Sequence, residues 1–223
     1  GETETGVTLH HMTPGIDDGD IVAQQRVSID ADDNAQTLVN KQVAAAGSML
    51  DECLPAIKAG SAGRTPQNND EATYFGGRTA DDGAIDWSQS AAAVHNLVRA
   101  VTRPYPGAFT FAGQRRLTIW ETEVIEHSSD AQPGTILSVD PLEIACGEAA
   151  VRVRFGQQES GVFSTGGQLA SGMNLVAAMR LGPKFEKASK GRKTSPHNHC
   201  YIKMLGIFNY SFFKTFSRLI NHN

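Results

Sequence analysis

Hydrophobic and polar positions alternate near the start of the chain. Residues 6–9 and 20–26 mix β-branched or apolar side chains with polar ones, and Pro14 and Gly15 interrupt the pattern between them. Such alternation is typical of a half-buried β-strand, and a proline followed by a glycine is typical of a turn. The opening of the chain therefore predicts a strand, a loop and a second strand.

Residues 33–57 predict a long helix. The sequence DNAQ at residues 33–36 resembles a capping box, and apolar residues follow it at helical spacing. Gly60 marks the end of the helix, and Pro55 is expected to kink or end it because proline lacks the N–H donor of a regular helix. The polar residues 60–71, rich in Gly, Asn and Pro, then predict a loop that leaves this first unit.

A second helix is predicted over residues 86–101. Its apolar residues recur three, four and seven positions apart, which places them on one face of a helix. Ser88 or Ser90 can cap the N-terminus, and the sequence RPYPG at residues 103–107 ends the helix. The apolar residues of this face are Val94, Leu97, Val98 and Val101.

Short β-type runs follow residue 107. They are separated by pairs such as Pro-Gly, Asp-Pro and Gly-Glu, which favour turns. Five short strands in close succession predict a small barrel of the OB type, and residues 168–181 are expected to form a helix that closes it. The predicted strands cover residues 108–111, 116–125, 135–139, 142–146 and 151–155.

The composition is that of a chain with a buried core. Of its 223 residues 40 % are hydrophobic, and no run comes near the roughly 18 apolar residues that a membrane span needs. The three cysteines, Cys53, Cys146 and Cys200, are far apart and odd in number, which suits a reducing compartment and predicts neither a disulfide framework nor a zinc site. A cytoplasmic protein without a metal is therefore expected.

The net charge of −4 hides an asymmetry. Residues 184–223 contain eight Lys or Arg and one Glu and carry +7, whereas the body before them has twelve basic and twenty-three acidic residues and carries −11. An acidic body is a poor electrostatic match for a phosphate backbone, so no nucleic-acid partner is expected. The basic, aromatic-rich residues 184–223 are predicted to form an unstructured tail.

Three carboxylates cluster in the loop between the first two predicted strands. Asp17, Asp18 and Asp20 lie in the sequence GIDDGD, residues 15–20. Loops at strand ends are where open α/β folds keep their ligands, and a carboxylate there can tune a neighbouring base. The alternative is a solvated or calcium-like acidic turn, although the twelve-residue calcium-loop pattern lacks its final bidentate acid here. The residue types alone leave both interpretations open.

Longer sequence matches favour a functional role for the carboxylates of this loop. The sequence ETGVTLHHM at residues 4–12, followed by GIDDGDIV at residues 15–22, resembles the segment of formyltetrahydrofolate-dependent formyltransferases in which a TGVT strand leads into a loop that ends in Asp-x-Gly. The resemblance implies that Asp17 is catalytic and lies beside a catalytic histidine, whose pKa it raises so that the imidazole can exchange protons. It also implies that the formyl donor, 10-formyltetrahydrofolate, is bound by Thr13, Pro14, Gly15, Ile16 and Asp17.

The second half of the chain narrows the resemblance. The sequences FGGRTADD, IDW, VHNLVRA, PYPGAF and IACG resemble the branch of the family that formylates UDP-4-amino-4-deoxy-L-arabinose for lipid A modification and polymyxin resistance. Methionyl-tRNA formyltransferases share part of these patterns, but they need a basic surface for tRNA, whereas the body of this chain is acidic. A non-catalytic OB-type binding module is a further alternative.

The resemblance implies the domain organisation and an α/β fold class. Residues 1–75 correspond to the C-terminal part of a Rossmann-like formyltransferase subdomain, and residues 76–183 to a small OB-like β-barrel subdomain. The catalytic Asn and His of the family and its SLLP loop have no counterpart in the sequence and would lie before Gly1. We therefore expect an N-terminally truncated part of a homo-oligomeric parent enzyme, inactive by itself.

Some residues have an ordinary structural interpretation. His10 and His11 lie at the end of the first predicted strand and, without a second cluster of ligands, are expected to form hydrogen bonds rather than bind a metal. Trp87 and Trp120 are expected to pack against other side chains rather than stack on bases.

Overall fold

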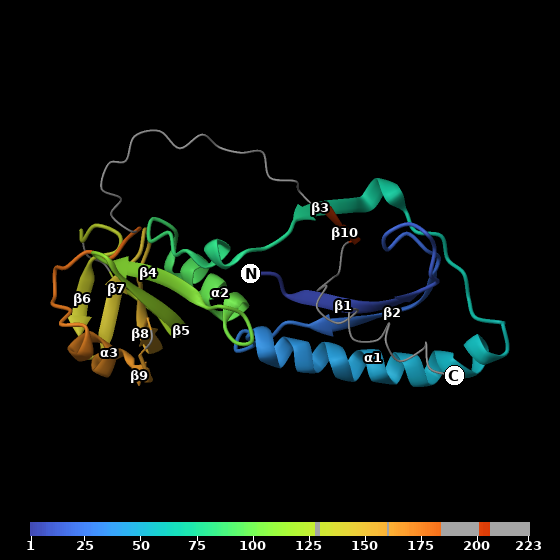
Figure 1. The fold of residues 1–223 in the computed structure, drawn as a ribbon, viewed down its shortest axis with the longest axis horizontal. Coiled ribbons are helices and arrows are strands. Elements are labelled where there is room, and N and C mark those ends of the chain that lie inside the picture. The colour runs from blue at the N-terminus through green and yellow to red at the C-terminus, as the bar shows by residue number, and fades with distance from the viewer. Residues whose placement is uncertain (128–129, 160, 184–200, 206–223) are drawn as a thin grey trace. The chain divides into compact units, whose positions relative to one another are not determined.

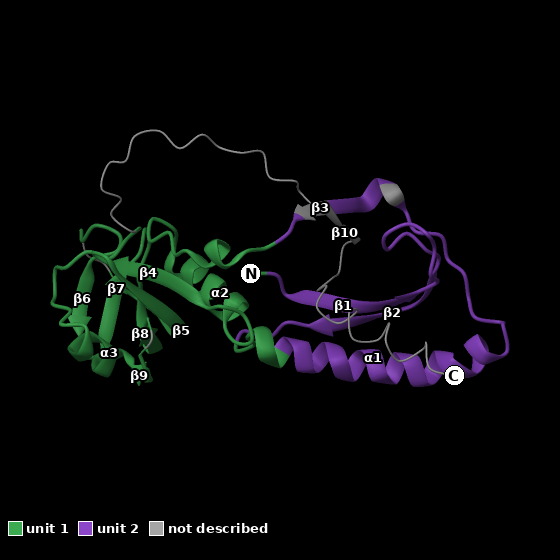
Figure 2. Cartoon of the chain, viewed as in Figure 1, with its two compact units in different colours: residues 1, 32–37, 78–196 green, residues 2–31, 38–77, 197–223 purple. Residues whose placement is uncertain are grey.

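The computed structural model describes residues 1–127, 130–159, 161–183 and 201–205. The chain divides into two compact units, which Figure 2 shows in green and purple. Unit 1 consists of residues 1, 32–37 and 78–196, and unit 2 of residues 2–31, 38–77 and 197–223. Figure 1 labels the helices and strands of each.

A β-hairpin opens unit 2. β1 (Glu4–His10) pairs antiparallel with β2 (Ile21–Ser28). β1 includes the first alternating segment, and β2 begins one residue after the start of the second. Thr5 and Thr8 of β1 are buried, and Gln24 Nε2 on β2 donates a hydrogen bond to Thr8 Oγ1 at 3.0 Å. The predicted strand, loop and strand are therefore present.

The helix α1 (Ala35–Lys58) runs along this hairpin (Figure 1). Asn34 caps it, since its Oδ1 accepts the backbone N–H groups of the second and third helical residues at 2.9 and 3.1 Å. Gln42 Nε2 on α1 donates to Thr5 Oγ1 on β1 at 3.3 Å. The helix does not end at Pro55, because a proline in the last turn removes a single donor and leaves the remaining bonds intact.

Two short elements complete the described part of unit 2. A 3-10 turn, η1 (Asn69–Glu71), leads into β3 (Ala72–Gly76), which pairs antiparallel with β10 (Tyr201–Leu205). Apart from β10, the tail that was predicted to be unstructured lies outside the described residues.

An antiparallel sheet dominates unit 1 (Figure 1). Its strand order is β4-β5-β8-β7-β6, with β9 paired to β8. The five predicted strands are all present, with ends displaced by at most three residues, and β9 was not predicted. The strands are β4 (Ala108–Ala112), β5 (Arg115–Ile125), β6 (Ile136–Val139), β7 (Leu142–Ala145), β8 (Ala150–Gln158) and β9 (Phe163–Thr165).

Residues 178–182 connect the two edges of this sheet. On the β6 edge, the Ile136 N–H donates to the Met179 carbonyl at 2.8 Å, and on the β4 edge Phe111 and Gly182 exchange N–H···O bonds of 2.9 and 3.1 Å. An open edge exposes unpaired backbone groups, so these bonds close the curled sheet. The structure thus confirms the α/β class with an OB-like β-barrel subdomain.

The closing helix predicted over residues 168–181 is wrong in extent. The helix α3 covers only Gly166–Gly172, and its N-terminus is capped by Thr165. Beyond it, Asn174 and Ala178 have φ angles of 49° and 66°, which a right-handed helix does not contain. Turns at residues 173–174 and 177–178 interrupt the segment, and the two edge strands use the backbone hydrogen-bonding groups of residues 178–182.

A 3-10 turn, η2 (Ala80–Gly83), precedes α2 (Ala91–Val101) in unit 1. Ser90 is the N-cap of α2, and its Oγ accepts the Ala93 N–H at 3.2 Å. The helix begins later than residue 86, since the Asp86 carboxylate accepts the Ser88 N–H at 3.0 Å and folds the preceding residues into a turn.

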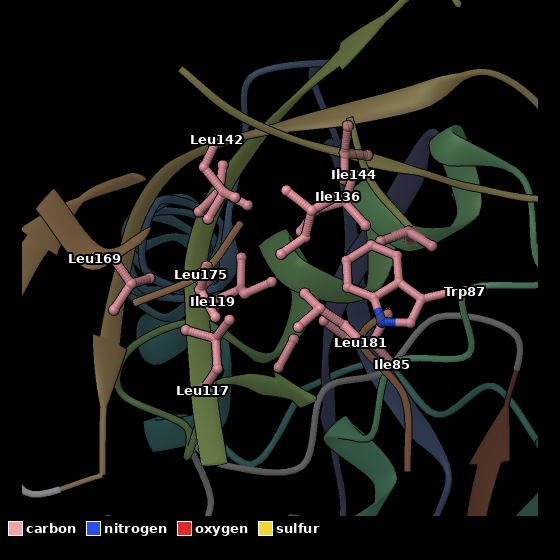
Figure 3. Close-up of a cluster of buried hydrophobic side chains, with 14 of the residues drawn as sticks. Ile85, Trp87, Leu117, Ile119, Ile136, Leu142, Ile144, Leu169, Leu175 and Leu181 are labelled. Carbon is pink, nitrogen blue, oxygen red and sulfur yellow. The ribbon is translucent and has the colours of Figure 1, made fainter. Parts of the chain in front are cut away.

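The sheet, α2 and α3 enclose the hydrophobic core of unit 1 (Figure 3). Trp87 is 4 % exposed within it, and its indole Nε1 donates to the buried Thr110 hydroxyl at 3.0 Å. Trp87 is therefore a packing residue, as expected. The most deeply buried large side chains of the strands are Leu117, Ile119, Ile136, Leu142 and Ile144.

Candidate functional site in the loop between β1 and β2

All of the candidate site residues lie in the loop formed by residues 11–20. The base of the loop is closed by a hydrogen bond from the His11 N–H to the Asp20 carbonyl O at 2.9 Å. Residues 63–67 run beside this base, where the first residue of β2 and Thr65 exchange N–H···O bonds of 2.8 and 3.0 Å. The hairpin and a distant segment of the chain therefore both anchor the loop.

Two glycines allow the loop to fold this tightly. A Cβ atom at Gly19 would overlap the backbone carbonyl of His11, and a Cβ at Gly15 would overlap the carboxylate of Asp18. Gln67 also donates a hydrogen bond from its Nε2 to the Gly19 carbonyl. Glycine fits at both positions because it has no Cβ.

Two of the three carboxylates maintain the shape of the loop. Asp18 accepts a hydrogen bond from the Thr13 hydroxyl, and Asp20 lies 3.4 Å from the guanidinium of Arg64. In the part of the chain that the structure describes, no group of three or more His, Cys, Asp or Glu side chains is arranged to hold a metal ion. Asp18 and Asp20 are thus structural members of the loop.

Asp17 differs from these two because it faces a base. Its Oδ1 lies 3.7 Å from His10 Nε2, and the two side chains are 39 % and 11 % exposed. Asp17 has a φ of 52°, a left-handed conformation that aspartate tolerates better than most residues. A partly exposed carboxylate of this kind can orient an imidazole.

The residues predicted to bind the formyl donor form the tip of the loop. Residues 13–16 are exposed, and Ile16 and Met12 are 62 % and 85 % exposed. Exposed apolar side chains gain from being covered by a ligand with an apolar surface. The role of Thr13, Pro14 and Gly15 in donor binding stays a prediction.

Two family models match the chain. Residues 1–54 match the model described as Formyl transferase, and residues 78–174 match the model described as Formyl transferase, C-terminal domain. The chain belongs to the formyltransferase family. The first match includes the whole of the β1–β2 loop, and the second includes the strands of the barrel. The resemblance inferred from the sequence is confirmed at the level of the family.

Several solved structures share this fold. A variant of HypX from Aquifex aeolicus has a TM-score of 0.63 at 17 % identity, over 88 % of this chain and 34 % of that one. HypX in complex with tetrahydrofolic acid gives 0.59 at 18 % identity, over 87 % and 34 %. The N-formyltransferase from Helicobacter canadensis, in complex with folinic acid and dTDP-3-aminofucose, gives 0.54 at 19 % identity, over 71 % and 57 %. The chain thus spans about a third to somewhat more than half of these proteins.

The pairing of His10 with Asp17 was missed from the sequence. His10 was expected to be a hydrogen-bonding residue, and its Nδ1 does lie 3.0 Å from the His11 carbonyl O. The contact with Asp17 crosses a loop of irregular backbone, which leaves no periodic signal in the sequence.

Among the described residues, no helix is long and apolar enough to cross a membrane.

Proposed function

We propose that the protein transfers a formyl group from 10-formyltetrahydrofolate to the amine of a sugar nucleotide. The proposed acceptor is UDP-4-amino-4-deoxy-L-arabinose, as in the formyltransferase domain of ArnA, which serves lipid A modification and polymyxin resistance. The observation that carries the proposal is the β1–β2 loop, which, in a chain of the formyltransferase family, presents Asp17 as a partly exposed carboxylate facing a base. A cytoplasmic location and a homo-oligomeric parent belong to the same proposal.

The proposed reaction is attack of the acceptor amine on the formyl carbon. The new C–N bond forms on the sugar, the bond between the formyl carbon and folate N10 breaks, and the amine proton is transferred to N10. The family resemblance assigns the proton transfer to a histidine and the oxyanion to an asparagine, neither of which has a counterpart in this sequence. The Asp17 carboxylate favours the charged form of that histidine and so keeps it in its working state.

Solved structures and the loop tip support a folate donor. HypX was solved with tetrahydrofolic acid, and the Helicobacter canadensis enzyme with folinic acid. In this chain, Ile16 at the tip is 62 % exposed and lies beside Asp17. An apolar side chain next to a carboxylate suits a ligand with a flat ring and a reacting nitrogen.

Sequence patterns and charge support a sugar-nucleotide acceptor. The Helicobacter canadensis enzyme was solved with dTDP-3-aminofucose, an amino-sugar nucleotide. Two arginines of β8 are paired with carboxylates, Arg152 with Glu143 at 2.9 Å and Arg154 with Glu123 at 3.2 Å. Paired guanidinium groups are poorly available to a phosphate backbone. This pairing disfavours the alternatives of a methionyl-tRNA formyltransferase and of an OB-type binding module for nucleic acid.

Substitution of Asp17 in the natural protein that carries this chain tests the proposal. We expect Asp17→Asn to lower kcat for formylation of UDP-4-amino-4-deoxy-L-arabinose roughly 100-fold or more, because the variant no longer favours a charged histidine. Asp51→Asn is the matched control, since Asp51 is exposed on α1 in the same unit. Product formation is measured by liquid chromatography and mass spectrometry.

Near-normal turnover of Asp17→Asn would remove Asp17 from the active site.

Titration with single-stranded oligonucleotides at two salt concentrations tests the binding-module alternative. Tight, salt-sensitive association would favour that alternative over the enzyme.

A further inference from the structure

We propose that His10 positions the Asp17 carboxylate for formyl transfer. This inference rests on the proposed function and adds a positioning residue to it. His10 is the last residue of β1, and its side chain is 11 % exposed. Both ring nitrogens have a neighbour, since Nδ1 lies 3.0 Å from the His11 carbonyl O and Nε2 lies 3.7 Å from Asp17 Oδ1.

The backbone directs the two side chains toward each other. Leu9 pairs with Ala23, whereas His10 pairs with Ile21, so β2 contributes one extra residue at this point. A β-bulge of this kind bends the strand and re-aims the neighbouring side chain. Asp17 reaches the same place through its left-handed backbone, with a φ of 52°. Two local irregularities, one on each side, therefore produce a single contact.

The hydrogen bond on one side of the ring determines what the other side can do. A carbonyl oxygen only accepts, so the bond between His10 Nδ1 and the His11 carbonyl requires a proton on Nδ1. Nε2 of the neutral ring then presents a lone pair toward Asp17, whereas Nε2 of the charged ring presents an N–H. The charged ring is the form that attracts the carboxylate and holds it in one orientation.

The surroundings of the loop make Asp17 the carboxylate that His10 meets. Asp18 is engaged by the Thr13 hydroxyl, and Asp20 by the Arg64 guanidinium at 3.4 Å. At 3.7 Å the contact between His10 and Asp17 is an ion-pair distance rather than a hydrogen bond. His10 therefore acts on the direction of the carboxylate and leaves its oxygens accessible to a further donor.

Substitution of His10 by asparagine or by glutamine distinguishes the roles of the two ring nitrogens. His10→Asn places its amide near Nδ1, so it keeps the bond to the His11 carbonyl and loses the contact with Asp17. His10→Gln places its amide near Nε2 and keeps a donor toward Asp17. We expect kcat of His10→Asn to fall roughly 10- to 100-fold with an unchanged KM for the formyl donor, since a misplaced group slows chemistry more than binding. We expect His10→Gln, which keeps a donor toward Asp17 but lacks the charge, to retain more of kcat than His10→Asn.

The reverse order would overturn the inference, because an active asparagine variant and an impaired glutamine variant are the signature of a residue that only supports the loop. Adding His10→Asn to Asp17→Asn is expected to cause no further loss, because the two residues act as one unit. If Asp17→Asn is itself harmless, the proposed function fails. If Asp17→Asn is inactive and His10→Asn is fully active, the positioning role alone fails.

A spectroscopic measurement on the chain itself does not depend on catalysis or on the folding of His10 variants. In ¹⁵N spectra of the imidazoles, we expect His10 Nδ1 to show the signal of a protonated nitrogen and Nε2 to shift in Asp17→Asn. His127, which belongs to unit 1, serves as the internal control and should not shift. A His10 Nε2 signal that does not respond to Asp17→Asn would contradict the proposed contact.

Discussion

Gly19→Ala is expected to open the base of the β1–β2 loop. The added Cβ would overlap the backbone carbonyl of His11, and a backbone atom cannot move aside by a change of rotamer. The loop must then give up the bond from the His11 N–H to Asp20 and the bond from Gln67 to the Gly19 carbonyl. At about 1 kcal/mol for each hydrogen bond, the local cost is about 2 kcal/mol.

Gly47→Ala is the matched control for this substitution. Gly47 lies inside α1, and an added Cβ meets no atom within 4 Å. Alanine in a helix interior is favoured over glycine by about 0.5–1 kcal/mol, so the control is expected to stabilise unit 2 slightly. The same substitution, glycine to alanine, is thus expected to have opposite effects on stability at two positions of one unit.

Hydrogen exchange of single amides is the assay, because both tryptophans of the chain lie in unit 1 and tryptophan fluorescence would not report on this loop. A local cost of about 2 kcal/mol corresponds to a roughly 30-fold loss of protection of the His11 amide. Gly47→Ala should leave that protection equal or higher. Equal protection of the His11 amide in Gly19→Ala and in the unmodified chain would refute the packing argument.

Two further predictions follow from the shifted pKa values of unit 1. Burial, with a smaller contribution from Arg99, lowers the pKa of His95 below its ordinary value of 6.5. The stability that comes from a neutral His95 is therefore complete above pH 6.5, and it is lost as the pH falls through the lowered pKa. Urea unfolding of His95→Gln should therefore show less acid-dependent loss of stability, and an unchanged dependence would contradict this. Burial also raises the pKa of Cys146 to about 11, so its thiol should resist iodoacetamide at mildly alkaline pH while the half-buried Cys53 reacts. Peptide mass spectrometry measures the alkylation of each cysteine, and alkylation of Cys146 in the folded chain would contradict the expectation.

Local patterns in the sequence predicted the elements that depend on local interactions. Alternating residues marked β1 and β2, and the apolar face of residues 94–101 marked α2, whose N-cap is Ser90, one of the two serines predicted for it. The family resemblance singled out Asp17 among three carboxylates of one loop. The predictions of β1, β2 and α2 succeeded because periodicity and capping act over a few residues, whereas the role of Asp17 stays a prediction.

Features that depend on distant parts of the chain could not be predicted from local sequence patterns. β9 has three residues, too few to show alternation, and it forms because β8 offers it a partner. Residues 178–181 were expected to be helical, but Ala178 lies in a turn and the residues after it bond to the edges of β4 and β6. The backbone groups of an edge strand are satisfied by whichever segment the fold brings there.

By itself, the sequence determined the order and type of the main elements, the family and the candidate carboxylate. Only the tertiary structure decided which partner each carboxylate of the loop has. A bulge in β2 opposite the end of β1 and a left-handed residue in the loop bring His10 and Asp17 to within 3.7 Å. Such contacts follow from backbone irregularities and from anchoring by residues 63–67, and neither leaves a repeating pattern of side chains along the chain.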